Sequence, residues 1–206
     1  MKSLMPIGPG DLDALTELFN VGLHRAAASL SEVTGQRIHV DMPRLWVYEI
    51  GEIEVRLRDL LIGELATVRQ VFGGAVAGDA VLLIEHDKAA ALTKLMTDGE
   101  VSIGGRLDHS AREVLTEVGN IVLGACLSGF GDMLQSPVSF SVPRLRVESL
   151  GSLLKSLDAP GDEVQYAVIC ATRFGLSELA VDGYLVVAVG AASLDRMLEG
   201  LTGQAL

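Results

Sequence analysis

The chain has 206 residues, enough for one large domain or two small ones, and 49% of them are hydrophobic while only 4% are aromatic. A chain of this size and composition can bury most of its apolar surface, which excludes a predominantly disordered protein. Its 16 lysine and arginine residues against 27 acidic residues give a formal net charge of −11, which argues against nucleic acid as a ligand.

Neither a membrane span nor a secretion signal is predicted. The longest apolar runs, Ala80 to Ile84 and Tyr184 to Ala192, are far shorter than the ~20 residues of a membrane-spanning helix. Prolines and glycines interrupt the first ten residues before a signal peptide could develop. We therefore expect a cytoplasmic protein without membrane insertion. Cys126 and Cys170 lie among apolar residues, which favours reduced, buried thiols over a disulfide.

The first half of the chain predicts one long helix followed by strands and a short helix. Asp11 or Asp13 can cap the long helix, and Gly35 is expected to end it. Its apolar residues recur every three or four positions and predict one buried stripe: Leu12, Leu15, Phe19, Leu23, Ala26, Leu30 and Val33. Extended segments are expected at 38–40, 45–48, 54–57, 66–72 and 79–85, before a helix over 88–96.

The second half predicts the same succession of elements. Ser110 and Glu113 have the spacing of a capping box, in which each side chain satisfies a free backbone amide of the first turn. The helix that they begin is expected to end near Met133. Extended segments are expected at 138–142, 144–148, 164–173 and 179–189, before a last helix over 193–201. Between the halves, 97–100 and 104–105 contain turn residues but no linker.

Comparison of the sequence with itself at an offset of one hundred residues indicates an internal repeat. The positions that match are Leu15, Thr16, Glu17, Asn20, Leu23, Pro43, Arg44 and Leu45. We therefore predict a single domain over 1–206, made of two repeats at about 8–100 and 108–206. The expected fold class is α/β (α+β), a pseudo-twofold duplicated unit with one shared β-sheet, two long helices packed on one face and additional short helices.

A polar stripe follows the outer face of each long helix. It comprises Asp13, Glu17 and Asn20 in the first helix and Glu113, Glu117 and Asn120 in the second. A single Glu and Asn pair on a helix is usually solvated surface. Asparagine disfavours a helix interior because its amide competes with backbone hydrogen bonds, so its recurrence at one register indicates a function.

Three glycines lie inside the second long helix, where each costs about 1 kcal/mol relative to alanine. They are Gly119, Gly124 and Gly129. Close packing against neighbouring elements explains part of this pattern. A second hypothesis is that Gly119 and Gly124 flank Asn120 on the exposed side and leave room for another protein.

The spacing of these residues resembles the signature of the CheC, CheX and FliY chemotaxis phosphatases: Asp or Ser, three residues, Glu, two residues, Asn, twenty-two residues, Pro. It occurs as Asp13, Glu17, Asn20 and Pro43, and again as Glu113, Glu117, Asn120 and Pro143. The resemblance covers nearly the whole chain. It is closest to CheC, because CheX-like chains carry one complete motif and FliY-like chains append a further domain.

The resemblance implies a protein phosphatase that hydrolyses the aspartyl phosphate of a CheY-type response regulator in chemotaxis or related two-component signalling. Glu17 or Glu117 would dock onto the receiver's active-site lysine, and Asn20 or Asn120 would orient the attacking water. A carboxamide suits this role because it both accepts and donates hydrogen bonds. No cofactor or metal of its own is expected, since Mg²⁺ is supplied on the response regulator.

Departures from the family pattern rank the second motif above the first. Phe19 and His24 replace small residues beside the first asparagine and are expected to crowd a docking receiver, although His24 is interpreted as a surface residue. Gly119 keeps a small neighbour beside the second asparagine. Glu113 stands where the family has Asp or Ser, and an additional acid there could alter docking.

Two other functions are weighed against the phosphatase. One is a non-catalytic CheC-like adaptor that binds a receiver domain or a CheD-type receptor deamidase. The other is a small-molecule-binding α/β domain, which would require a sizeable apolar pocket that the sequence does not indicate. The internal repeat already provides the symmetry of a dimer, which favours a monomer.

Overall fold

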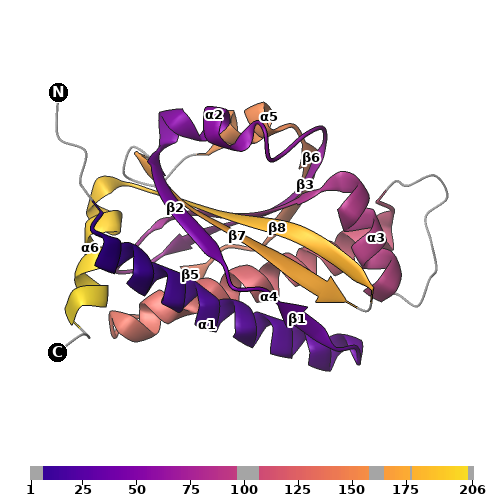
Figure 1. Cartoon of the computed structure of the whole chain (residues 1–206), viewed down its shortest axis with the longest axis horizontal. Coiled ribbons are helices and arrows are strands. Elements are labelled where there is room, and N and C mark those ends of the chain that lie inside the picture. The colour runs from indigo at the N-terminus through magenta and orange to yellow at the C-terminus, as the bar shows by residue number, and fades with distance from the viewer. Residues whose placement is uncertain (1–6, 97–106, 158–164, 177, 204–206) are drawn as a thin grey trace.

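The computed structural model describes residues 7–96, 107–157, 165–176 and 178–203, and these form three layers (Figure 1). The sheet lies in the middle. Helices α1 (Pro9–Thr34) and α4 (His109–Met133) cover one face, and α2 (Ile53–Leu57) and α5 (Leu150–Ser156) cover the other. Helices α3 (His86–Met96) and α6 (Ala191–Gly203) lie at opposite ends of the layers. The turns predicted at 97–100 and 104–105 lie outside the described residues.

The sheet is antiparallel, and each half of the chain completes the sheet of the other. Its strands are β1 (Ile38–Val40), β2 (Arg44–Glu49), β3 (Leu65–Gly73), β4 (Gly78–Glu85), β5 (Ser139–Phe140), β6 (Arg144–Glu148), β7 (Tyr166–Leu176) and β8 (Leu179–Val189). Their order is β1-β7-β8-β4-β3-β5, with β2 also beside β7 and β6 also beside β3. The short strands of the first half therefore pair with β7 of the second half, and those of the second half pair with β3 of the first.

The expected fold class is confirmed: one shared sheet carries two long helices on one face. The order helix, two strands, helix, two strands, helix occurs in both halves, with an additional 3₁₀ turn η1 (Ile50–Glu52) before α2. Strands β4 and β8 join the halves, with Leu82 opposite Leu185. The interpretation of the two halves as repeats of one ancestral unit stays a prediction.

Helix α1 buries the predicted apolar stripe along most of its length. Leu15, Phe19 and Leu23 are fully buried, and the Phe19 ring packs edge-on against Phe130 of α4 with the centroids 6.0 Å apart. Val33 is an exception, since 70% of it is exposed. It lies in the last turn of α1, beyond the last buried residue of the helix, so periodicity alone placed it wrongly.

Gly8, and neither Asp11 nor Asp13, is the N-cap residue of α1, whereas Gly35 ends the helix as predicted. The helix begins after Gly8, and the Asp11 carboxylate accepts a hydrogen bond from the Gly8 backbone amide at 3.2 Å. Asp11 rather than Asp13 therefore stabilises the first turn. At the other end, Gly35 takes a φ of 66°, a left-handed conformation in which glycine carries no steric penalty.

The capping box predicted for α4 is wrong. Asp108 is the N-cap residue, and its carboxylate accepts a hydrogen bond from the Ala111 backbone amide at 2.8 Å. The helix thus begins at His109, which places Ser110 and Glu113 inside it. Both Asp and Ser are good caps, and the acidic residue two positions earlier takes the role.

The layer formed by α2 and α5 differs from the sequence prediction. Residues 54–57 alternate polar and apolar side chains and were expected to be a strand, but they belong to α2. Ile53 and Leu57, four residues apart, are buried against the sheet, as are Leu150 and Leu153 of α5. Helices of one or two turns are too short to reveal a helical period in the sequence.

Helix α4 is, by length and composition alone, apolar enough to cross a membrane, and no other helix among the described residues meets this criterion. In the structure it is a core helix. Val122, Leu123 and Cys126 are fully buried in the cluster that α1, α4 and the sheet form together. The apolar side chains that make α4 resemble a membrane-spanning helix pack into the core of the protein.

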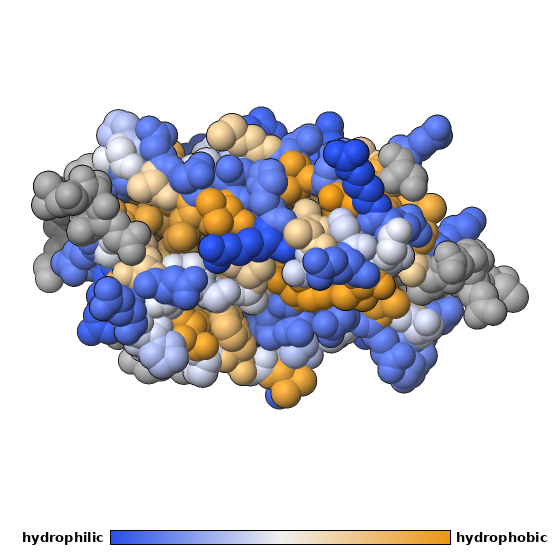
Figure 2. Space-filling model, turned by 90° about the horizontal axis from the view of Figure 1, so that it is seen from below, coloured by the Kyte–Doolittle hydropathy of each residue, from blue (hydrophilic) through white to orange (hydrophobic). Residues whose placement is uncertain are grey.

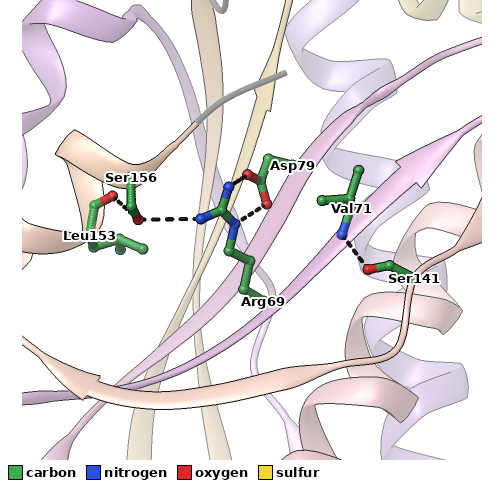
Figure 3. A network of polar contacts seen from close by, with 6 residues as sticks. All are labelled: Arg69, Val71, Asp79, Ser141, Leu153 and Ser156. Carbon is green, nitrogen blue, oxygen red and sulfur yellow. Dashed lines mark hydrogen bonds and ion pairs between the residues drawn. The ribbon is translucent and has the colours of Figure 1, made fainter. Parts of the chain in front are cut away.

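A buried ion pair links the sheet to the α2 and α5 layer (Figure 3). Asp79 of β4 is fully buried and accepts hydrogen bonds from Nε and Nη2 of Arg69 on β3, the first at 2.7 Å. The Nη1 group of Arg69 donates to the Ser156 hydroxyl at the end of α5, at 3.3 Å. The Arg69 guanidinium therefore joins two strands and a helix.

Removing the buried carboxylate should be costly, because the partly buried guanidinium would lose its partner. Asp79→Ala is expected to lower the free energy of unfolding by about 3 kcal/mol in urea denaturation. The control is Asp132→Ala, which breaks an exposed pair with Arg25 and should cost at most about 1 kcal/mol. Equal losses in the two variants would contradict a structural role for the buried pair.

The two cysteines are free and buried, as the sequence predicts. Burial raises the pKa of both thiols, that of Cys170 to about 12, because the charged thiolate is disfavoured away from water. At about pH 8 neither thiol should therefore react with the disulfide reagent DTNB in the folded protein, whereas both should react after unfolding. Rapid labelling of either thiol in the folded protein would contradict this burial.

Candidate functional site

The two long helices lie antiparallel and in close contact. Gly22 of α1 faces the backbone of Cys126, and a Cβ added to Gly22 would lie 2.7 Å from the Cα of Cys126. Leu18, which precedes Gly22 in α1, contacts Gly129, which follows Cys126 in α4, so the two helices run in opposite directions. Only glycine permits such an approach of two helix backbones. The outer stripes of both helices consequently share one surface, where hydrophilic and apolar areas alternate (Figure 2).

The first motif places its residues on this surface. Asp13 and Glu17 are exposed and Asn20 is half-buried. The Asn20 Nδ2 lies 3.5 Å from Oε2 of Glu17, whereas its Oδ1 is buried and has no hydrogen-bond partner in the described part of the chain. His24 is exposed, with Nδ1 2.9 Å from the backbone oxygen of Asn20, which agrees with a surface role.

The second motif has the same exposure but different contacts. Glu113 and Glu117 are exposed and Asn120 is half-buried. The Asn120 Oδ1 accepts a hydrogen bond of 3.1 Å from Nε2 of Gln70, which lies on β3 and is only 2% exposed. Glu113 lies 3.5 Å from Nδ1 of His109, one turn earlier. The side chain of Asn120 is thus hydrogen-bonded to a residue of the sheet.

Sequence reasoning missed Gln70. A signal was present, because Gln70 stands between Val68 and Phe72 at the positions of β3 that face the long helices. Strand residues two apart share a face, so a glutamine at this register must be buried among apolar side chains. A buried amide requires hydrogen-bond partners, and Asn120 is one of them.

The proline of the second motif follows a segment that crosses the end of β3. Ser141, two residues before Pro143, donates its backbone amide to the Val71 oxygen at 2.9 Å. The backbone oxygen of Ser141 accepts a second hydrogen bond from Gln70, at 3.1 Å. Gln70 thus binds both Asn120 and the segment just before Pro143, so the residues between the asparagine and the proline bring these two parts of the motif close together.

The first half repeats this crossing with a shorter side chain in place of glutamine. Asp41, two residues before Pro43, donates its backbone amide to the Arg173 oxygen at 3.0 Å. Its backbone oxygen accepts a hydrogen bond of 2.7 Å from the Thr172 hydroxyl. The motif proline itself is buried in the first half and half-buried in the second.

Open depressions lie beside both glutamates. Glu17 borders a groove of about 390 Å³ between the long helices, where Arg25 and Asp132 face each other at 3.7 Å. Glu117 lines a shallow hollow of about 560 Å³ together with Arg112 and Leu145. Both depressions are wide enough at the surface to admit side chains of another protein.

A small-molecule site receives little support. The apolar cavity between the helices and the sheet, beneath Leu30 and Val118, measures only about 20 Å³. Typical ligand pockets enclose at least ~300 Å³. The depressions beside Glu17 and Glu117 reach this volume but are open at the surface rather than enclosed. Among the described residues, no group of three or more His, Cys, Asp or Glu side chains could hold a metal ion.

Two expectations about crowding near the asparagines are wrong. Phe19 is fully buried, so it does not obstruct a partner. Gly119 faces the sheet rather than solvent, and a Cβ there would lie 2.4 Å from the Cβ of Val68. Only Gly124, where a Cβ would meet nothing within 4 Å, leaves open space on the side of Asn120.

These glycines give a matched pair of substitutions. Gly119→Ala should lower the free energy of unfolding by about 1–3 kcal/mol, because the new methyl group overlaps Val68. Gly124→Ala should raise it by up to about 1 kcal/mol, because alanine favours the helix and fills empty space. Chemical denaturation measures both changes, and a loss of stability in Gly124→Ala would contradict the assignment of that face to solvent.

Comparison with known proteins finds distant relatives, although no protein-family model matches the chain. CheC1 from Halobacterium salinarum is 23% identical over 135 residues, covering 65% of this chain and 67% of that protein. The CheY-P phosphatase CheC from Bacillus subtilis is 22% identical over 149 residues, covering 69% of each.

Solved structures share the fold over nearly the whole chain. FliY from Thermotoga maritima superposes with a TM-score of 0.77 at 19% identity, covering 97% of this chain and all of that one. FliM in the FliG–FliM complex from H. pylori gives a TM-score of 0.66 at 10% identity, covering 93% and 99%. The chain is thus similar in sequence to two CheC proteins and shares its fold with FliY and FliM.

Proposed function

We propose that this protein is a phosphatase for the aspartyl phosphate of a CheY-type response regulator. The observation that carries the proposal is the pair of exposed glutamates, Glu17 and Glu117, each followed one turn later by a half-buried asparagine on one shared surface. The name of the relative from Bacillus subtilis, a CheY-P phosphatase, supports the same substrate.

To accelerate this hydrolysis, the phosphatase has to supply little more than the correct position of the attacking water. A phosphorylated receiver brings Mg²⁺ and a lysine that neutralise the phosphoryl oxygens, so hydrolysis lacks mainly a water molecule held in line. The water oxygen bonds to phosphorus as the bond to the aspartate oxygen breaks. The water proton passes to the departing phosphate, and the aspartate is regenerated.

Each motif residue has a distinct part in this reaction. Because Oδ1 of Asn20 and of Asn120 is turned inward, Nδ2 is the group of each carboxamide that meets the attacking water. It donates a hydrogen bond to one lone pair of the water and directs the other lone pair toward phosphorus. The exposed carboxylates of Glu17 and Glu117 dock onto the receiver's lysine and set the depth of the asparagine. The protein itself contributes no nucleophile and no metal.

Exposed apolar side chains near both motifs provide contact area for a partner. Met42 is 72% exposed and Val142 is 80% exposed, and each directly precedes the proline of its motif. Large apolar side chains on the surface of a protein commonly mark an interface. Their matching positions suit one partner class that docks in the same way at either site.

A non-catalytic adaptor is the second candidate, and one observation favours it. The Oδ1 atoms of Asn20 and Asn120 are both turned inward, one buried and the other bonded to Gln70. An adaptor on this fold would bind a receiver domain or a CheD-type deamidase without accelerating hydrolysis. FliM, solved in complex with FliG, is an example of the same fold in a protein assembly.

The decisive experiment follows the decay of a phosphorylated, Mg²⁺-bound CheY-type receiver with and without this protein. The wild type should accelerate the decay, and Asn120→Ala should reduce the acceleration at least about tenfold, because the attacking water is no longer oriented. The double variant with Asn20→Ala should abolish it. Ser128→Ala, an exposed change two turns further along α4, is the control and should act like the wild type.

Two results would contradict the phosphatase. Decay that stays at the spontaneous rate while the receiver still binds would favour the adaptor. Acceleration that survives in the double variant would assign catalysis to residues other than the two asparagines.

A further inference from the structure

Gln70 connects the second asparagine to strand β3 of the sheet. Its Nε2 donates hydrogen bonds to Oδ1 of Asn120 and to the backbone oxygen of Ser141, both at 3.1 Å. Ser141 is in turn held by Val71. The Val71 amide donates to the Ser141 hydroxyl at 2.9 Å (Figure 3). The Val71 oxygen accepts from the Ser141 amide, also at 2.9 Å.

This arrangement fixes the orientation of both amide groups. A backbone oxygen only accepts hydrogen bonds, so the amino group of Gln70 must be the end that faces Ser141. The same amino group then requires an acceptor on Asn120. The Oδ1 of Asn120 therefore points toward the sheet, and its Nδ2 points away from Gln70.

The first half of the chain lacks this connection. Sheet pairing sets Leu145 opposite Val68 and Leu45 opposite Cys170, so Gln70 and Thr172 occupy equivalent positions two residues further along. Thr172 donates to the Asp41 oxygen as Gln70 does to Ser141. The structure contains no hydrogen bond between Thr172 and Asn20, whose Oδ1 has no partner among the described residues.

We propose that Gln70 is a positioning residue of the second site, where it holds the Asn120 carboxamide in one orientation before a receiver docks. This inference rests on the proposed phosphatase function. In the first site no such hydrogen bond to the sheet holds Oδ1 of Asn20, and the side chain is oriented by the 3.5 Å contact of its Nδ2 with Oε2 of Glu17. The two sites of the protein are thus unequal although their motifs match.

The position of Gln70 determines which kinetic parameter it affects. Because only 2% of Gln70 is exposed, it cannot touch a docked partner. Ser141, the other residue that it binds, keeps two hydrogen bonds to Val71, so Gln70 acts on the site through Asn120. Loss of its hydrogen bond lets the carboxamide rotate, which reduces the fraction of complexes with a correctly held water. Loss of Gln70 should therefore lower kcat and leave KM for the phosphorylated receiver unchanged.

The test is a double-mutant cycle between Gln70 and Asn120. Gln70→Met keeps the size of the side chain and removes its amino group. In an Asn20→Ala background, where the second site acts alone, Gln70→Met should lower kcat about three- to tenfold, the equivalent of one net hydrogen bond. In an Asn120→Ala background the same substitution should have no effect. Thr172→Val, the matched change in the other half, should leave the second site unaffected.

A second readout does not depend on catalysis. In ¹⁵N-correlated NMR spectra, Gln70→Met should shift the side-chain NH₂ signals of Asn120, and Thr172→Val should leave them in place. Unshifted signals in Gln70→Met would overturn the proposed contact whatever the activity of the protein.

The outcomes separate this inference from the proposed function. An inactive wild type overturns the phosphatase, and the positioning role with it. An active wild type in which Gln70→Met lowers kcat equally in both backgrounds overturns only the positioning role, since the residue then supports the whole fold. The positioning role also fails if Asn20→Ala alone abolishes activity, because the second site would then be inactive.

Discussion

The close packing of α1 against α4 is the constraint on which the site depends. Gly22 lets the helix backbones approach, and the apolar stripes of both helices are buried against each other and against the sheet. Only the outer stripe of each helix remains available to solvent. Because the helices are antiparallel on one face of a shared sheet, two Glu and Asn pairs are displayed on one surface of a single chain.

The sequence predicted the parts of the structure that repeat over many residues. The long helices, the main strands and the buried stripe of α1 follow from periodicity that extends over several turns or strand positions. Some features that depend on only a few residues, such as the short helix α2 and the N-cap of α4, were predicted wrongly. Residues 54–57 are too few to distinguish a helix from a strand, and Asp108 replaced Ser110 as the cap of α4 because neighbouring residues compete for that position.

The candidate site shows a similar division. Motif spacing placed both asparagines on the outer face of their helices, whereas in the structure they are half-buried and Asn120 is hydrogen-bonded to the sheet. Phe19 and Gly119, interpreted as neighbours that control access, are buried, and Gln70 escaped notice because its contact with Asn120 joins residues fifty positions apart. Contacts of this kind arise only from the pairing of strands and the packing of helices onto them.

The central claim is that the asparagines meet the phosphoryl group of a docked receiver. The most direct measurement is a crystal structure of this protein with a Mg²⁺-loaded receiver activated by beryllofluoride, a mimic of the aspartyl phosphate. The account predicts a carboxamide of Asn20 or Asn120 within hydrogen-bond distance of the water in line with the beryllium, and Glu17 or Glu117 beside the receiver's lysine. A complex in which the receiver docks elsewhere and leaves both motifs exposed would contradict it.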